Sequence, residues 1–157
     1  MRAIHLFLLA AMIGVELILG VVVAPVVFYP QNLIGENILS QFQSGLIMSD
    51  IFVKMGYVLL VVSLFNAFYE LFSFMKKQEN FRLRFSKFAL AFIILILALF
   101  FVFYLTAYIL EAQKMGESVI KTAEFQSMHE ASEVVIKIIV CMQIFLYFLS
   151  FKIAKKD

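Results

Sequence analysis

The sequence predicts an all-α fold, a four-transmembrane-helix bundle with amphipathic helices in its two outer loops. Hydrophobic residues make up 64% of the 157 residues, whereas soluble domains contain about 45–50%. The apolar residues gather in four segments, each long enough to cross the roughly 30 Å hydrocarbon core of a bilayer as a helix. Basic residues lie mainly between and beyond these segments. Together these observations predict a single integral membrane domain, residues 1–157, whose principal partner is the lipid bilayer.

The four spans are expected at approximately residues 4–28, 51–75, 85–110 and 134–154. The first apolar run is longer than the roughly 7–15 residues of a signal-peptide core, so it is expected to be retained as a span. The third contains the uncharged stretch FALAFIILILALFFVFYLTAYIL. It is therefore expected to be the most lipid-exposed helix.

The distribution of Lys and Arg predicts the orientation. The connection QNLIGENILSQFQSGLIMSD has neither residue, and the third connection has two Lys among five Glu. The second connection and the two ends of the chain carry most of the basic residues: Arg2, Lys76, Lys77, Arg82, Arg84, Lys87, Lys152, Lys155 and Lys156. We therefore expect a multi-pass protein of the bacterial inner membrane with both termini in the cytoplasm.

Both outer loops contain apolar residues at helical spacing, which predicts amphipathic helices at the outer interface. These helices either cap the bundle or cover a cavity. The residues concerned are Leu33, Ile34, Ile38, Leu39, Phe42, Leu46 and Ile47 in the first loop, and Met115, Val119, Ile120, Ala123 and Met128 in the third.

Glu16 is the main candidate for binding a solute or cation, because it lies near the middle of the first span. Charged residues at that depth usually face the bundle interior or a water-filled cavity. Gly20 and Ala24 follow at four-residue steps, a spacing of small residues that lets another helix approach closely. Pro25 lacks an N–H, so the carbonyl of Val21 loses its helical partner. The outer third of this helix is expected to kink and lean toward the Glu16 face.

Two further polar stripes lie in the second and fourth spans. Asn66 is expected to make interhelical hydrogen bonds, and Glu70 to form an ion pair with Lys76 or Lys77 of the basic connection. His129 and Glu133 have the four-residue spacing of two metal ligands on one helix face. A metal site there competes with a structural role, because Lys137 can neutralise Glu133.

Several function classes lack support in the sequence. It has no Gly-rich phosphate loop, nucleophile elbow, HExxH or CxxC motif, so we expect neither an enzyme nor a bound cofactor. His5 is expected at the membrane interface rather than as a haem ligand. The formal net charge of +2 does not indicate a nucleic-acid partner.

Three segments of the chain form a recognisable pattern: GVELILGVVVAPVVF, SGLIMSDIFVKMGYVLL and FQSMHEAS. They resemble the bacterial domain-of-unknown-function 4149 family, which includes the transmembrane-protein-205-like proteins. In the family pattern an Asn follows the His by about two turns, where this sequence has Ile136 and Lys137. The resemblance implies a four-helix membrane protein and supplies no reaction. The residues that carry it are Gly20, Ala24, Pro25, Phe28, Gly45, Ile51, Phe52, His129 and Ser132.

The leading hypothesis is a membrane protein that moves or senses a small solute or cation, using Glu16 and the region of His129 and Glu133. The competing hypothesis is a non-transporting assembly or stabilising subunit, in which the buried polar residues only join helices. A homo-oligomer is expected, because four short helices enclose little volume.

Overall fold

The computed structural model describes residues 1–31, 35, 39–76 and 80–154, and throughout these residues the regular structure is helical. Four helical segments in the described residues are long and apolar enough to cross a membrane: Arg2–Phe28, Gln41–Met75, Phe81–Lys114 and Ala123–Lys152. The predicted all-α fold with four spans is therefore confirmed.

The first and third spans each contain a π-helical segment. The first consists of α1 (Arg2–Ile18), η1 (Leu19–Val23) and α2 (Ala24–Phe28). The third is built in the same way from α5 (Phe81–Phe100), η2 (Phe101–Thr106) and α6 (Ala107–Lys114).

The second and fourth spans are uninterrupted α-helices. They are α4 (Gln41–Met75) and α8 (Ala123–Ala154), and the short α7 (Glu117–Ile120) precedes α8. Helix α4 begins with a capping box, in which Ser40 and Gln43 each bond the other's backbone N–H. Helix α5 begins at Asn80, whose side chain accepts a hydrogen bond from the N–H of Arg82.

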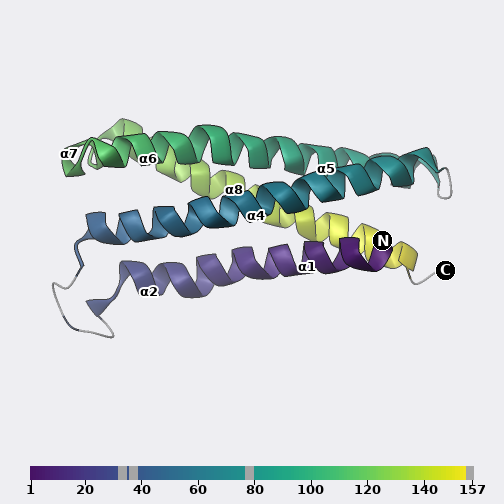
Figure 1. Ribbon diagram of the computed structural model, residues 1–157, viewed down its shortest axis with the longest axis horizontal. Helices are drawn as coiled ribbons and strands as arrows, with labels where there is room; N and C mark the ends of the chain where they lie inside the picture. The colour runs from purple at the N-terminus through teal and green to yellow at the C-terminus, as the bar shows by residue number, and fades with distance from the viewer. Residues whose placement is uncertain (32–34, 36–38, 77–79, 155–157) are drawn as a thin grey trace.

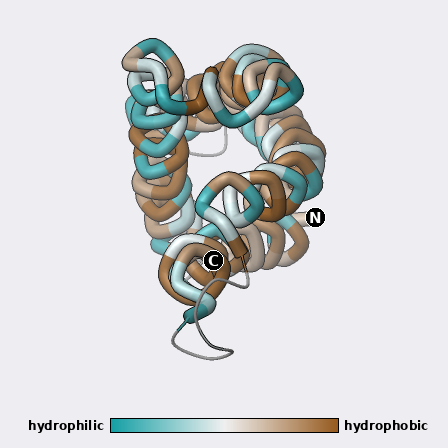
Figure 2. The backbone as a smooth tube through the Cα atoms, turned by 90° about the vertical axis from the view of Figure 1, so that its left-hand side faces the viewer, coloured by the Kyte–Doolittle hydropathy of each residue, from teal (hydrophilic) through white to brown (hydrophobic). Residues whose placement is uncertain are grey.

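The four spans form an elongated bundle (Figure 1). Helix α4 packs along α5, and α8 crosses the bundle so that it contacts α6 and η2 at one end and α1 at the other. One end of the bundle, which we call the terminal end, contains the start of α1, the end of α4, the start of α5 and the end of α8. Figure 2 looks along the bundle from the opposite end and shows the spans arranged around a common axis.

The amphipathic segments of the two loops mostly extend the spans. From Gln41 onward the first is the start of α4 itself, and its residues 33, 34 and 38 lie outside the described part of the chain. In the third loop, α6 ends at Lys114, and Gly116 follows two residues later with a φ of 103° that suits glycine. A single turn, α7, then precedes α8. Each predicted amphipathic helix is thus largely continuous with its neighbouring span.

The first span departs from the expected arrangement around Gly20. Gly20 is exposed, and a Cβ placed on it would meet nothing within 4 Å, so the predicted close helix contact does not occur there. Leu19, three residues after Glu16, packs on the core instead. The π-helical η1 begins at this point, and Ala24 donates its N–H to the carbonyl of Leu19, five residues back.

Pro25 directly follows this wide turn and is exposed, while Ala24 is half-buried. The missing N–H of Pro25 coincides with a local change in helix type, and one helical rod continues from α1 into α2 (Figure 1). The predicted lean toward the Glu16 face stays a prediction.

The close helix approach occurs instead between α4 and η2. A Cβ on Gly56 would lie 2.9 Å from Cγ2 of Val102, so only glycine fits without a shift of its neighbour. The third span is also less lipid-exposed than expected. In its most apolar 18-residue stretch 28% of the residues are buried, against 17% in the first span, because α5 packs between α4 and α8. High apolarity did not distinguish a lipid-facing surface from a helix-facing one.

Candidate functional site

The buried face of α1 carries a polar residue at each end. His5, Leu9, Met12 and Glu16 are its four buried residues, spaced at four, three and four positions so that they share one side of the helix. The two polar residues are eleven positions apart, or about 16 Å along the axis. They therefore belong to two separate polar sites with an apolar layer between them.

The first site joins the carboxyl group of Glu16 to the side-chain amide of Gln143 on α8. Nε2 of Gln143 lies 3.4 Å from Oε1 of Glu16 and donates to it. Both residues are buried, with exposed fractions of 7% and 1%. Two oxygen atoms in this site, Oε2 of Glu16 and Oε1 of Gln143, are buried without a hydrogen-bond partner. Buried acceptors of this kind call for a donor or a cation, because leaving them unpaired is costly.

The second site surrounds His5 near the terminal end. Nδ1 of His5 lies 2.9 Å from Oδ1 of Asn66, and Nε2 lies 3.1 Å from Oε1 of Glu70. The imidazole ring stacks on Tyr69 with a centroid separation of 4.2 Å. His5 is completely buried, so its predicted place at the membrane interface is wrong. The sequence of α1 alone did not show that His5 points into the bundle.

Glu70 links this site to two further helices. Its Oε2 lies 3.5 Å from Nζ of Lys87 on α5, and its Oε1 accepts a hydrogen bond of 3.3 Å from the hydroxyl of Ser150 on α8. The carboxyl is 1% exposed and Lys87 is 3% exposed. The predicted partner Lys76 does not pair with Glu70, and Lys77 lies outside the described residues. The pairing across helices joins all four spans, because α1, α4, α5 and α8 each contribute one of its groups.

Arg84 closes the same end of the bundle. Its Nη1 donates to the carbonyl of Phe74 at 2.5 Å, and its guanidinium lies 5.3 Å from the centroid of the Phe74 ring. These contacts tie the start of α5 to the end of α4, so Arg84 holds the two helices together.

The structure does not bring His129 and Glu133 to Glu16. Both lie in the first turns of α8, with side chains 40% and 52% exposed, and Glu133 precedes Gln143 by ten residues, about 15 Å along the helix. Their side chains are 3.4 Å apart, and Lys137 lies 3.0 Å from Glu133. In the described residues no group of three His, Cys, Asp or Glu side chains is placed to hold a metal ion. Glu133 is here part of a surface ion pair.

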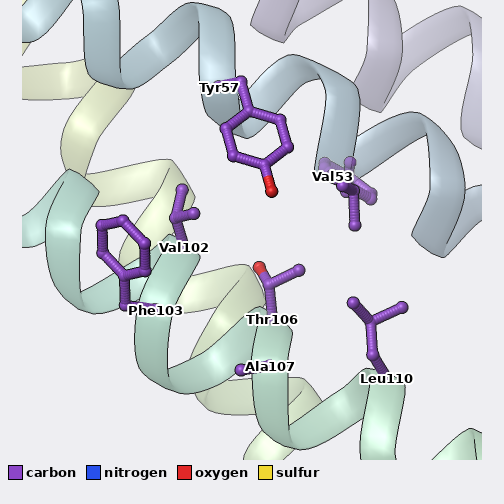
Figure 3. A pocket seen from close by; sticks show the side chains of 8 residues that line it. Val53, Tyr57, Val102, Phe103, Thr106, Ala107 and Leu110 are labelled. Carbon is purple, nitrogen blue, oxygen red and sulfur yellow. The ribbon is translucent and has the colours of Figure 1, made fainter.

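A shallow apolar groove lies apart from both polar sites, between α4 and the third span (Figure 3). It encloses about 180 Å³, and none of the buried ionisable residues lines it. Tyr57 projects into it from α4, facing Thr106 of η2. Thr106 donates its hydroxyl to the carbonyl of Phe101 at 2.9 Å, a five-residue separation that fits the wide π-helical turn. The groove is thus a feature of the apolar surface, and the polar chemistry is inside the bundle.

The sequence also matches a known protein family. The family described as a domain of unknown function (DUF4149) matches residues 7–118, more than two thirds of the chain. The chain belongs to the DUF4149 family. No match was found among the curated proteins or among the solved structures.

The DUF4149 match divides the two polar sites. It contains Glu16, Asn66, Glu70 and Lys87, but it excludes His5 and the whole of α8. The segment FQSMHEAS, which also resembled the DUF4149 pattern, lies beyond the matched region.

Sequence reasoning found Glu16, Asn66 and Glu70, but it missed the side chains that complete the two sites. These are His5, Lys87, Gln143 and Ser150. A signal was present in α8, where Gln143 and Ser150 are seven residues apart within an apolar helix and so lie on one face. Lys87 was assigned to the connection because it follows four other basic residues there. Which of these groups meet depends on helix packing and cannot be taken from one helix alone.

Proposed function

We propose that this protein moves or senses a small cation across the membrane, with Glu16 as the group that binds it. The observation that supports this proposal is the pair of buried, unpartnered oxygens on Glu16 and Gln143. A carboxyl group inside a membrane bundle is costly to retain. Here it has no basic partner among the described residues, so its charge is left to an exchangeable cation.

The chemistry of the site favours a cation with few ligands. Dehydrated Ca²⁺ takes 6–8 oxygen ligands, and Mg²⁺ requires about six in an octahedron. Glu16 and Gln143 provide two free oxygens, which suits a proton or a loosely held monovalent ion. Gln143 orients the carboxyl group by donating a hydrogen bond to Oε1 of Glu16. Oε2 of Glu16 therefore remains available to the cation.

The test uses purified protein in liposomes that contain either a thallium indicator or a pH indicator. We expect the wild-type protein to raise the entry rate of at least one of these cations above that of protein-free liposomes. Glu16→Gln, which keeps the size and the hydrogen bond to Gln143, should return that rate to background. Glu133→Gln, a surface carboxyl of the same type, should leave it unchanged. Equal rates in wild type and Glu16→Gln would contradict the proposal.

The distribution of charge supports a definite orientation. The terminal end carries the start of α1, the basic start of α5 and the end of α8, so we propose that this end faces the cytoplasm of a bacterial inner membrane. The test places a single cysteine at either Arg2 or Glu117 in a Cys141→Ser background. An impermeant maleimide added to intact spheroplasts should label position 117 and leave position 2 unlabelled. Labelling at position 2 but not at position 117 would contradict this orientation.

A non-transporting assembly subunit is the competing function. The contacts of Glu70 with His5, Lys87 and Ser150 favour it, because they show that buried polar groups do join the four spans. If the wild-type protein passes no cation in liposomes and crosslinking in cells recovers one constant partner, the subunit function replaces the proposal above.

A further inference from the structure

The site around His5 has the geometry of a group that gains and loses a proton. Each ring nitrogen of His5 faces an oxygen, Oδ1 of Asn66 at 2.9 Å and Oε1 of Glu70 at 3.1 Å. A neutral imidazole has only one N–H. If that hydrogen lies on Nδ1 and is donated to Asn66, Nε2 and an ionised Glu70 would present two acceptors to each other. An additional proton between Nε2 and Oε1 removes this conflict.

The neutral form of His5 is also provided for. The hydroxyl of Ser150 lies 3.5 Å from Nε2 of His5 and 3.3 Å from Oε1 of Glu70. A hydroxyl hydrogen rotates to suit its surroundings. It can donate to Glu70 when His5 carries the extra proton and to Nε2 when His5 is neutral. Both states of the ring are therefore hydrogen-bonded without movement of a helix.

One carboxylate lies among the basic side chains of this site. Glu70 lies between His5 and Lys87, so one carboxylate faces two basic side chains. With His5 neutral, Glu70 and Lys87 balance each other. With His5 charged, a second positive group shares the same carboxylate in a buried environment, where such charge is costly. The remaining neighbours of the ring, Asn66, Tyr69 and Ser150, carry no charge at neutral pH.

The two polar sites lie on the same buried faces of α1 and α8, with an apolar layer between them. On α1, Leu9 and Met12 separate His5 from Glu16, and on α8, Leu146 separates Ser150 from Gln143. These three apolar residues are all at most 2% exposed. A metal ion crossing this layer would lose its ligands, whereas a proton needs only a transient chain of water.

We propose that His5, with Glu70 and Ser150, is a second proton-binding site on the path that includes Glu16, and that the cation moved by this protein is the proton. This proposal rests on the proposed function and specifies its substrate. In each passage, one proton leaves the carboxyl of Glu16 and one binds a ring nitrogen of His5, by way of water that enters the layer of Leu9, Met12 and Leu146. In the opposite direction the same bonds break and form in reverse. No oxidant or reductant is needed.

The experiment measures proton entry into liposomes containing a pH indicator, driven by a potassium diffusion potential and without other permeant cations. We expect His5→Gln, which can bond to Asn66 but cannot carry a proton, to lower the initial rate about a hundredfold or to background. The matched control is His129→Gln, which changes the other histidine at an exposed position and should retain the wild-type rate. Ser150→Ala removes the movable hydroxyl and should lower the rate about tenfold.

The outcomes separate this inference from the proposed function. Wild-type proton entry that persists in His5→Gln would overturn the second site. Wild-type protein that passes thallium but no protons would overturn the inference and leave the proposed function in place, and this result needs no variant. Absence of both fluxes would reject the proposed function itself. If His5→Gln does not fold, Ser150→Ala and the wild-type ion comparison decide the outcome.

Discussion

At the residue scale, the most consequential contact is the buried ion pair between Glu70 and Lys87, which are 1% and 3% exposed. Two charges removed from water offset each other only while both are present. Loss of one partner removes this compensation from the other charge inside the bundle. Lys87 therefore has a role beyond the membrane-orienting charge that its position in the sequence suggests.

Lys87→Met is expected to lower the free energy of unfolding by up to about 3–5 kcal/mol, because the carboxylate of Glu70 loses an ion-pair partner and keeps only His5 and Ser150. The double variant Glu70→Gln with Lys87→Met should recover most of this loss, since it removes both charges. Unfolding of the purified protein in mixed micelles with increasing denaturing detergent measures both effects.

The matched control is Lys137→Met, in which the lost partner is the surface carboxylate of Glu133. That pair is 70% and 52% exposed, so its loss should change stability by less than about 0.5 kcal/mol. Equal effects of the two Lys→Met changes would show that Lys87 is not paired in the interior.

The sequence predicted several polar residues of the two sites but not their partners. Glu16, Asn66 and Glu70 were recognised because a polar residue in an apolar helix is costly wherever it lies. Their partners depend on which helices touch and at what depth. His5 was expected at the interface because it lies near the start of the first span. The stripe on α1 alone does not show that α4 covers this residue.

At the element scale, the two π-helical segments determine which faces meet. η1 begins just where Gly20 leaves the helix contact, and η2 accompanies the close packing of Val102 on Gly56. The buried residues of α1 alternate steps of four and three, as a turn of 3.6 residues requires. The prediction for Gly20 was wrong because it used two four-residue steps in a row, whereas the buried stripe passes through Leu19.

Gly56→Ala is expected to destabilise the protein by about 1–3 kcal/mol, because the added methyl group overlaps Val102, whose β-branched side chain is stiff in a helix. Val102→Ala in the same chain should restore much of the stability by removing the methyl group that is in the way. The control is Gly14→Ala, where nothing lies within 4 Å of the new Cβ. There the change should be neutral or stabilise by about 0.5–1 kcal/mol. Thermal unfolding in detergent measures all three variants, and an unaffected Gly56→Ala would contradict the close approach.

At the scale of the whole molecule, the number of spans followed directly from hydrophobic length, because a bilayer imposes a minimum run of apolar residues. The helices extend beyond the predicted spans. They begin earlier because the side chains of Ser40, Asn80 and Thr122 accept hydrogen bonds from backbone N–H groups of the first turn, before the apolar runs begin. The expected homo-oligomer stays a prediction. What hydropathy could not indicate is that two polar sites lie in series along the axis of this bundle.

Carbodiimide modification of the reconstituted wild-type protein tests whether Glu16 carries a cation through the interior of the bundle. Dicyclohexylcarbodiimide enters membranes and attacks protonated carboxyl groups in apolar surroundings. We expect peptide mass spectrometry to show that Glu16 is modified ahead of the exposed Glu133, and we expect cation entry into liposomes to fall in proportion to the modified fraction. Modification of Glu16 without loss of entry, or loss of entry while Glu16 stays unmodified, would show that Glu16 does not carry the cation.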